Sequence, residues 1–550
     1  MGIGLTNATK LRGGYYTPSL VAEWLARWAI RSGDDLVLEP SCGEGVFLTA
    51  ATAAFNGKNC FREIQSNQIM AIELMPEEAD KARILASRST TVITCDFFDW
   101  LEANMGTCLF DVVLGNPPFI RYQNFPEPSR SIAMKFLQEQ GFRPNRLTNI
   151  WVPFVVGAMA MLREGGRLAM VIPAELLQVT YAGQLRQRLA NSFRHITIYA
   201  CNEMFFDNAE QEVVLLLAEG KTSSVDPMNQ SDISLIAATT VDEVLRSNPR
   251  SIKDQSKPKN VQHSTEKWLK YFLDAEEIDF IRALREEHDE IGTLGDHAAV
   301  DVGVVTGNNR FFVLNQHQVD EFNVADFVIP LVGRSSQLSG AVLKKQELIS
   351  LAKKGKPVYL LHLTGRNMHE FTPGLRRMIA EGERREVQCG YKCSIRKPWY
   401  NVPSVWEPDC FFFRQIYDFP RIVINKTAAT STDTIHRIRC TSPASKIASN
   451  VYTHLTAASA EIEGRSYGGG VLELEPTEAE RLMMPRVLNG AMPIEEADRL
   501  VRTGRIKDVL EHNDKIVLRD SLGLSVTDCR MLMHIGAKMR DRRMSRRRTQ

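Results

Sequence analysis

Short apolar runs alternate with longer amphipathic stretches between Leu36 and about Gly220. The runs that predict strands are "LVLEP", "IMAIEL", "TVITCD", "FDVVLGN", "RLAMVIP", "HITIYA" and "EVVLLLAEG". Strands that alternate with helices form βαβ units, in which the strands are parallel and the helices cover the sheet. We therefore expect an α/β fold whose N-terminal part is one doubly wound sheet.

Two polar tracts, residues 220–232 and 247–267, follow the predicted sheet and flank a short αβ segment. They are typical of linkers or surface loops. Beyond Trp268, the runs "RFFVL", "CFFFRQI" and "RIVINKT" predict strands among helices, and so a second, mixed α+β domain. The predicted domains are residues 1–245, residues 268–535 and a basic tail at 536–550. The run "MRDRRMSRRRTQ" has no apolar periodicity and predicts a solvated end rather than a folded element.

The composition excludes several classes of protein. The chain has 550 residues, too many for one core, and its 44% hydrophobic and 24% charged residues are ordinary for a globular protein. No apolar run reaches the roughly 18 residues of a membrane span, and "MGIGLTNATKLRGGYY" has no signal core, so we expect a cytosolic protein without a membrane partner. The ten cysteines are scattered apart from "CGYKC", which predicts reduced thiols and no metal site.

The net charge of +1 conceals a difference between the two parts of the chain. Residues 1–220 carry 19 Lys+Arg and 23 Asp+Glu, whereas the remainder carries 48 and 43. The C-terminal part is therefore the better partner for a polyanion, although so small an excess indicates little by itself.

The first candidate site is the turn in "LVLEPSCGEGVFL". Glu39 ends the predicted strand, and Gly43 and Gly45 allow the backbone to approach a ligand closely before the next helix. The turn is neither GxGxxG nor a Walker loop with its lysine, so a phosphate is not the expected ligand.

Two further acids end the next two predicted strands. Glu73 follows "IMAI", where a ribose diol is usually held, and Asp96 follows "TVITC", with Phe97 beside it to pack on a purine ring. Any one of these acids alone is better explained as a solvated strand end. Three in succession favour a cationic, ribose-bearing cofactor, and S-adenosylmethionine fits that description.

The stretch "FDVVLGNPPFI" leaves its strand through an unusually stiff turn. Proline fixes φ and has no N–H, so the Asn116 side-chain oxygen and the Pro117 carbonyl, followed by Pro118, can both accept from one planar NH₂ group. Phe119 can stack on the ring that carries this amine. Two acceptors that draw the hydrogens out of the ring plane favour an attacking nitrogen, so direct methyl transfer needs no covalent intermediate. The alternative for this turn is a rigid structural corner.

In these stretches the chain resembles gamma-class (Taq-type, Eco57I-like) adenine-N6 DNA methyltransferases of type II restriction-modification systems. The resemblance rests on "YYTPSLVAEWL", "VLEPSCGEGVFL", "AIEL", "TCDFFDW", "GNPPF" and "MFFDNAEQEVVLLL", which cover the first 220 residues in the gamma-class order. It implies a Rossmann-like methyltransferase domain followed by a C-terminal target-recognition domain.

The resemblance also implies roles for single residues. It implies that S-adenosylmethionine, released as S-adenosylhomocysteine, is bound by Thr17, Pro18, Glu39, Ser41, Gly43, Gly45, Glu73, Asp96 and Phe97. The catalytic set that it implies is Asn116, Pro117, Pro118, Phe119 and Phe205, with Phe206 as the alternative to Phe205. The family often has tyrosine where this chain has Phe119, which keeps the stacking surface. The target adenine is expected to be flipped out of duplex DNA.

Two segments resemble the specificity domain of the family, "VGVVTGNNRFFVLN" and "GRSYGGGVLELEP". Their candidate DNA contacts are Thr306, Gly307, Asn308, Asn309, Gly468 and Gly469, with plain hairpin turns as the alternative. Candidate phosphate contacts are Arg366, Arg396, Lys397, Arg414 and Lys426.

Other substrates share a planar NH₂ group and stay open, namely cytosine N4 in DNA, guanine in RNA and glutamine in a protein. The large C-terminal region favours DNA, and Asn116 in place of serine favours adenine. A DNA-binding module without activity would lack one of the site residues. We expect a monomeric modification enzyme in the prokaryotic cytoplasm, acting at the nucleoid, with any cognate endonuclease on a separate chain.

Overall fold

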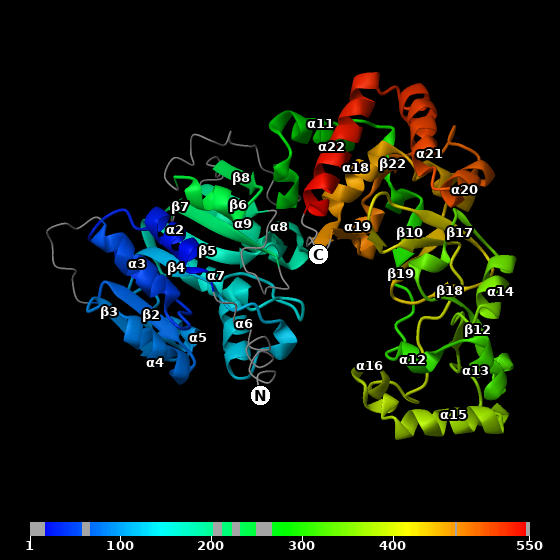
Figure 1. Ribbon diagram of the computed structural model, residues 1–550, viewed down its shortest axis with the longest axis horizontal. Helices are drawn as coiled ribbons and strands as arrows, with labels where there is room; N and C mark the ends of the chain where they lie inside the picture. The colour runs from blue at the N-terminus through cyan, green and yellow to red at the C-terminus, as the bar shows by residue number, and fades with distance from the viewer. Residues whose placement is uncertain are drawn as a thin grey trace. The chain divides into compact units, whose positions relative to one another are not determined.

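The computed structural model describes residues 17–57, 67–201, 212–222, 232–248, 267–467 and 470–545. The chain divides into a first unit, residues 1–278 with 545–550, and a second unit, residues 279–544 (Figure 1). Each unit has its own sheets and is described by itself. Within the described ranges, no helix combines the length and the apolar character that crossing a membrane requires.

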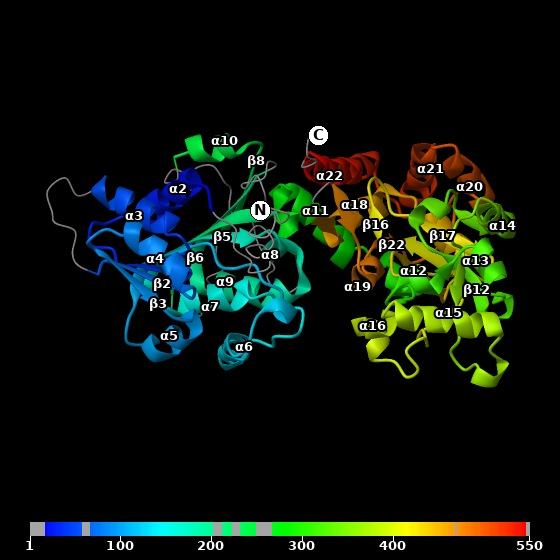
Figure 2. The ribbon, with the colours of Figure 1, turned by 60° about the horizontal axis from the view of Figure 1, so that its bottom comes forward.

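The first unit is built on one eight-stranded sheet in the order β3-β2-β1-β4-β5-β7-β6-β8. Figure 2 labels β2, β3, β5, β6 and β8 of this sheet. All neighbouring strands are parallel except at β7, which is antiparallel to both β5 and β6. The strands are β1 (Val37–Glu39), β2 (Ile69–Glu73), β3 (Thr90–Thr94), β4 (Phe110–Gly115), β5 (Leu162–Pro173), β6 (Phe193–Cys201), β7 (Val213–Lys221) and β8 (Asp232–Ala238). The seven predicted strands coincide with β1 to β7, and the predicted doubly wound fold is confirmed.

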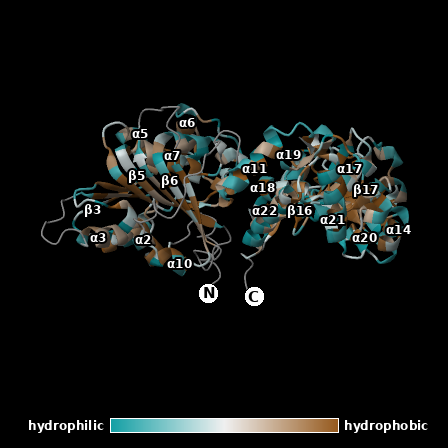
Figure 3. Ribbon diagram, turned by 90° about the horizontal axis from the view of Figure 1, so that it is seen from above, coloured by the Kyte–Doolittle hydropathy of each residue, from teal (hydrophilic) through white to brown (hydrophobic). Residues whose placement is uncertain are grey.

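Helices cover both faces of this sheet, with α5, α6 and α7 on one face and α2, α3 and α10 on the other (Figure 3). The helices are α2 (Ser19–Ala29), α3 (Val46–Asn56), α4 (Pro76–Leu85), α5 (Phe97–Asn104), α6 (Ser129–Glu139), α7 (Trp151–Ala160), α8 (Glu175–Gln178), α9 (Gly183–Ser192) and α10 (Val241–Arg246). Because helices lie on both sides, the central strands are buried on both faces. This is why they are continuous apolar runs rather than alternating ones.

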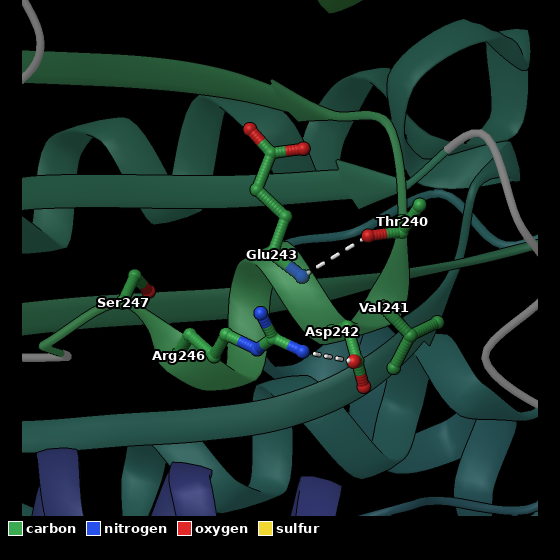
Figure 4. Close-up of a pocket in the computed structure, with 6 residues that line it drawn as sticks. All are labelled: Thr240, Val241, Asp242, Glu243, Arg246 and Ser247. Atoms are coloured by element: carbon green, nitrogen blue, oxygen red, sulfur yellow. Dashed lines mark hydrogen bonds and ion pairs between the residues drawn. The ribbon is translucent and has the colours of Figure 1, made fainter.

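The short segment between the two polar tracts belongs to the same sheet. It forms β8, which pairs in parallel with β6, and then α10. Figure 4 shows how α10 begins and ends: the Thr240 hydroxyl accepts from the N–H of Glu243 at 3.1 Å, and Arg246 pairs with Asp242 at 2.9 Å. The threonine satisfies one of the N–H groups that a helix start leaves without a partner.

The second unit is a mixed α+β structure with sheets of five, four, three and two strands. Its strands are β9 (Ile291–Thr293), β10 (Ala298–Asp301), β11 (Val313–Leu314), β12 (Val328–Val332), β13 (Val342–Lys344), β14 (Tyr359–Leu361), β15 (Cys410–Phe413), β16 (Gln415–Ile416), β17 (Ile422–Lys426), β18 (Thr430–Ser431), β19 (Ile435–Cys440), β20 (Arg465–Tyr467), β21 (Val471–Glu473) and β22 (Met483–Pro485). Helix α11 (Ala275–Glu286) crosses the division between the units. The other helices are α12 (Asn309–Phe312), α13 (Gln316–Glu321), α14 (Lys345–Lys353), α15 (Pro373–Arg384), α16 (Tyr391–Ser394), α17 (Ala444–Asn450), α18 (His454–Glu463), α19 (Pro476–Glu480), α20 (Ile494–Arg502), α21 (Ile506–Asn513), a π-helical turn (Asp514–Ser521) and α22 (Val526–Met544).

The predicted strand "RFFVL" is mostly wrong. Residues 309–312 form helix α12, and only Val313 and Leu314 are extended. The reason is local, because Asn308 caps the helix: its side-chain oxygen accepts from the N–H of Phe311 at 3.2 Å. A capping asparagine therefore outweighs the strand preference of the two phenylalanines.

The prediction of a solvated tail is wrong for its first part. Helix α22 continues to Met544, and the Arg543 side chain is buried. Its guanidinium donates to both carboxylate oxygens of Glu461, at 2.9 and 2.6 Å, and to the Gly470 and Tyr417 carbonyls. Both charged groups are therefore in the interior of the second unit, each satisfied by the other.

Replacing Arg543 by alanine is expected to lower the free energy of unfolding of the second unit by about 3–5 kcal/mol, because Glu461 would be left as a buried, unpaired carboxylate. Urea denaturation measures this change. The matched control is Arg499→Ala, which breaks an exposed pair with Glu496 at 3.6 Å and should change stability by no more than about 0.5 kcal/mol. Equal effects in the two variants would contradict the assignment.

Candidate active site

The carboxyl end of β1 carries a buried acid. Glu39 is 1% exposed, on a strand that lies between β2 and β4. One of its carboxylate oxygens has no hydrogen-bond partner among the described residues. Burial raises the pKa of Glu39 well above its usual value, and the neighbouring Glu73 raises it further. A carboxyl group in this position is poised to be stabilised by a cation or by a hydrogen-bond donor from outside the protein.

The second acid is fixed by the turn that follows β1. One oxygen of Glu73 accepts from the N–H of Gly43 and the other from the N–H of Met75, both at 2.9 Å. Burial raises the pKa of Glu73, and these two hydrogen bonds oppose the rise. Gly43 has φ +50°, in the left-handed region where glycine is favoured. The glycine turn therefore orients the acid that was predicted to hold a ribose.

The third acid, Asp96, lies at the start of helix α5. Asp96 caps helix α5, since one of its oxygens accepts from the N–H of Phe98 at 2.7 Å. Phe97 is 3% exposed and stacks on Phe154 with ring centroids 5.1 Å apart. The structure thus places Asp96 at the edge of the sheet and Phe97 in the core beneath it, packed against α7.

The rigid turn after β4 contacts two other candidate segments. The Asn116 amide nitrogen donates to the Thr17 hydroxyl at 3.2 Å, and the Ser41 hydroxyl donates to the Asn116 carbonyl at 3.3 Å. Thr17 is buried and directly precedes Pro18, which is exposed at the start of α2. Residues from three separate segments therefore meet at one end of the sheet.

Gly115 connects this turn to the acidic side of the site. Its φ is +153°, and a Cβ added there would lie 3.5 Å from Cγ of Glu39. The chain therefore turns at Gly115 directly against the Glu39 side chain. Phe119 follows with 8% of its surface exposed. The turn predicted to bind an amine and the acids predicted to hold the cofactor are thus neighbours, as a transfer reaction would require.

Some of the predicted residues lie outside the described part of the chain, namely Phe205, its alternative Phe206, Gly468 and Gly469. In the ranges that the structure describes, no group of three or more His, Cys, Asp or Glu side chains is arranged to hold a metal.

The predicted DNA-contact turn of the second unit is held by its own side chains. The Thr306 hydroxyl donates to the Asn309 side-chain oxygen at 2.6 Å, while Asn308 caps α12. Gly307 has φ +84° and packs against α16, where a Cβ would lie 2.9 Å from the Cβ of Lys392. These bonds make the turn a rigid corner of the unit.

The predicted phosphate contacts have different surroundings. Arg396 donates to the Val305 and Thr306 carbonyls, each at 2.7 Å, and so stabilises the predicted DNA-contact turn. Arg414 pairs with Glu473 and Glu475 at 2.9 and 2.8 Å. The remaining three candidates, Arg366, Lys397 and Lys426, are exposed.

The loop between α6 and α7 also adjoins the turn after β4, although none of its residues was among the predicted site residues. The Ile150 N–H donates to the Ile120 carbonyl at 3.0 Å, which joins this loop to the residue that follows Phe119. Part of the loop lines a surface hollow together with Thr180, Tyr181 and Gln184. The sequence "QGFRPNRLTNI" could have identified this loop as a candidate site, because it has two arginines and no acidic residue.

Sequence models of two protein families match the chain. "Type II methyltransferase M.Eco57I, C-terminal domain" matches residues 265–518, and "Eco57I restriction-modification methylase" matches residues 51–206. The chain belongs to the Eco57I-type restriction-modification methylases. The predicted family is thereby confirmed, and this Eco57I-type methylase is a type II DNA methyltransferase.

Individual relatives of the Eco57I-type methylase match along most of their length. Type II methyltransferase M.AccI of Acinetobacter calcoaceticus is 24% identical over 86% of this chain and 84% of the relative. Type II methyltransferase M.XamI of Xanthomonas campestris pv. amaranthicola is 22% identical over 87% and 86%. A solved structure, that of the Type IIL restriction-modification enzyme MmeI in complex with DNA, is also similar. The structural match covers 94% of this chain and 70% of the MmeI chain, with a TM-score of 0.51. At 12% identity this likeness shows the fold alone.

Proposed function

We propose that this methylase transfers a methyl group from S-adenosylmethionine to the exocyclic N6 amine of an adenine that is flipped out of duplex DNA. The observation that carries the proposal is the junction of the Asn116 turn with Thr17 and Ser41, directly against the buried Glu39. This arrangement sets acceptors for a planar amine beside an acid suited to a cation.

The acidic side of the site fits the cofactor. Glu39 is buried, with an oxygen that has no described partner, so a cationic ligand would supply the partner that the protein does not. Glu73 is oriented by two backbone N–H groups to accept from ribose hydroxyls. Asp96 has one oxygen occupied by its helix cap, which leaves the other for the amine of the cofactor's adenine. When bound, S-adenosylmethionine supplies a methyl group that its sulfonium makes electrophilic.

The chain's own residues position the nucleophile. Since the Asn116 amide nitrogen donates to Thr17, the amide oxygen lies on the other side of the group. An amide oxygen has two lone pairs and can accept from a substrate NH₂ together with the Pro117 carbonyl. Both bonds strengthen as the amine becomes tetrahedral and gains positive charge, so they act mainly in the transition state.

Adenine is favoured over cytosine by one residue in the turn. Serine in place of Asn116 would have indicated cytosine N4, whose exocyclic amine is chemically similar. Phe119 offers the flipped base a ring to stack on, and in this proposal Phe205 packs on the other face of the base.

The test is to incubate the protein with S-adenosylmethionine tritiated on its methyl group and with duplex DNA, digest the DNA to nucleosides and identify the labelled one. Label in N6-methyladenosine, as the deoxynucleoside, is the expected result. Label in N4-methylcytosine, or in protein but not in DNA, would refute the proposal. DNA that is already fully modified in the host serves as the control and should take up no label.

A further inference from the structure

The loop between α6 and α7 exposes a large apolar side chain. Leu147 is 73% exposed, and Arg143, Asn145 and Arg146 beside it are exposed as well. Both flanking helices are labelled in Figure 2. Residues 1–220 carry more acidic than basic side chains, but residues 120–150 carry five basic and two acidic ones. The apolar tip therefore lies in the locally basic part of an acidic unit.

This tip is ordered by its own hydrogen bonds. The Leu147 N–H donates to the Asn145 side-chain oxygen at 2.8 Å, and the Asn145 N–H donates to the Thr148 hydroxyl at 3.0 Å. Thr148 is buried, and the Arg143 N–H donates to the Gln184 side chain at 2.9 Å. The turn therefore holds Leu147 outward, although its side chain contributes almost no hydrophobic stabilisation there.

The tip is tied to the catalytic turn. Ile150 is fully buried, and its N–H donates to the carbonyl of Ile120, the residue after Phe119. Three residues of extended chain span no more than about 11 Å, which limits the distance from Ile150 to Leu147. The exposed leucine thus lies within a short reach of the place where the target base is proposed to stack.

The arginines around this tip carry free charges. Arg121, Arg143 and Arg146 are exposed, and within the described ranges none of them forms an ion pair. Other arginines of the first unit are paired: Arg163 with Asp111 at 3.1 Å, and Arg167 with Asp35 at 2.9 Å. Exposed guanidinium groups without a carboxylate partner suit phosphate oxygens, which fix a protein on a duplex without reading its sequence.

We propose that Leu147 enters the base stack at the position that the flipped adenine leaves, while Arg121, Arg143 and Arg146 hold the phosphates around it. This rests on the proposed function, because a gap in the stack exists only if a base is flipped. Flipping loses stacking and pairing worth a few kcal/mol, and an apolar wedge recovers part of it by filling the gap. Leucine has no hydrogen-bonding group, so the wedge fills space and does not select the sequence.

The experiment compares Leu147→Ala with Ile84→Ala, a matched control at an 83% exposed aliphatic residue on α4. The recognition sequence is first mapped by sequencing DNA methylated by the wild-type protein. Two substrates are then used, an intact duplex and a duplex whose target adenine faces an abasic site, so that pairing no longer opposes flipping. A third duplex with 2-aminopurine at the target position reports flipping by its fluorescence.

For Leu147→Ala we expect kcat/KM to fall about tenfold on the intact duplex and to return to within about twofold of wild type on the abasic duplex. The rise in 2-aminopurine fluorescence should shrink, Leu147→Met should restore it, and Ile84→Ala should match wild type throughout. Equal losses on both duplexes, or no loss on either, would overturn the wedge while leaving adenine methylation intact. If the wild-type protein methylates no adenine in any of the duplexes, the proposed function fails and the wedge fails with it.

Discussion

Asn116→Ala is expected to lower kcat for methyl transfer by about 10³-fold while S-adenosylmethionine still binds with nearly wild-type affinity. In the proposed mechanism the variant removes an acceptor that acts on the developing charge of the amine, and losing one such preorganised contact typically lowers the rate by two to three orders of magnitude. The Asn116 amide nitrogen donates to Thr17, whereas Glu73 is held by backbone N–H groups, so the acids proposed to bind the cofactor should keep their positions. Single-turnover kinetics and calorimetric titration with the cofactor measure the two quantities.

Thr17→Val is the graded control for this prediction. It removes the hydroxyl that orients the Asn116 amide but keeps the acceptor, so a loss of about tenfold in kcat is expected. A variant Asn116→Ala that turns over at the wild-type rate, or that loses cofactor binding and activity together, would contradict the role given to the turn.

Glu39→Gln is expected to weaken S-adenosylmethionine binding about 100-fold, because a buried hydrogen bond to a charged partner is lost, and to leave the cofactor-free protein at least as stable as wild type. The two effects differ in direction for one reason. Burying this carboxyl without a described partner destabilises the cofactor-free protein, whereas a bound cationic cofactor would be stabilised by the same carboxyl group. Thermal melts with and without cofactor check both parts. A variant that is less stable without cofactor and binds it normally would show that Glu39 is purely structural.

The raised pKa of Glu39 predicts that both the stability of the protein and its affinity for the cofactor depend on pH. The folded protein holds a proton on Glu39 more tightly than the unfolded chain does, since burial raises its pKa. Its contribution to stability is fully present below the ordinary pKa of glutamic acid and is lost as the pH rises through the raised value. Binding of a cationic cofactor should change in the opposite direction and strengthen over that range. Glu39→Gln should remove this part of both profiles, leaving the part from Glu73, which has the same sign.

The sheet was predictable because its central strands are buried on both faces and therefore appear as continuous apolar runs. Seven apolar runs, each ended by a polar or glycine-containing turn, coincide with β1 to β7. The proximity of Glu39, Glu73 and Asn116 followed from the same reasoning, since parallel strands bring their carboxyl ends to one edge. The burial of Phe97 against Phe154 did not follow, because α7 comes some fifty residues later and its packing is not readable from local sequence.

Polar contacts between residues far apart in the sequence could not be predicted either. Arg543 reads as one more charge in a basic run, and only the fold shows that it meets Glu461. Likewise Arg396 reads as a phosphate contact, whereas two carbonyls of the turn at 305–306 take up its guanidinium. Side chains of one type serve both purposes, and sequence spacing does not distinguish them.

The Arg543–Glu461 pair also affects the order in which the two units can fold during synthesis. Glu461 leaves the ribosome 82 residues before its partner, so the second unit cannot complete its interior until Arg543 has been synthesised. The first unit needs no residue beyond 278 for its sheet and can fold during that interval. Chains that stop short of Arg543 would retain an uncompensated buried carboxylate, and proteases that recognise unfolded segments should remove them before they reach DNA.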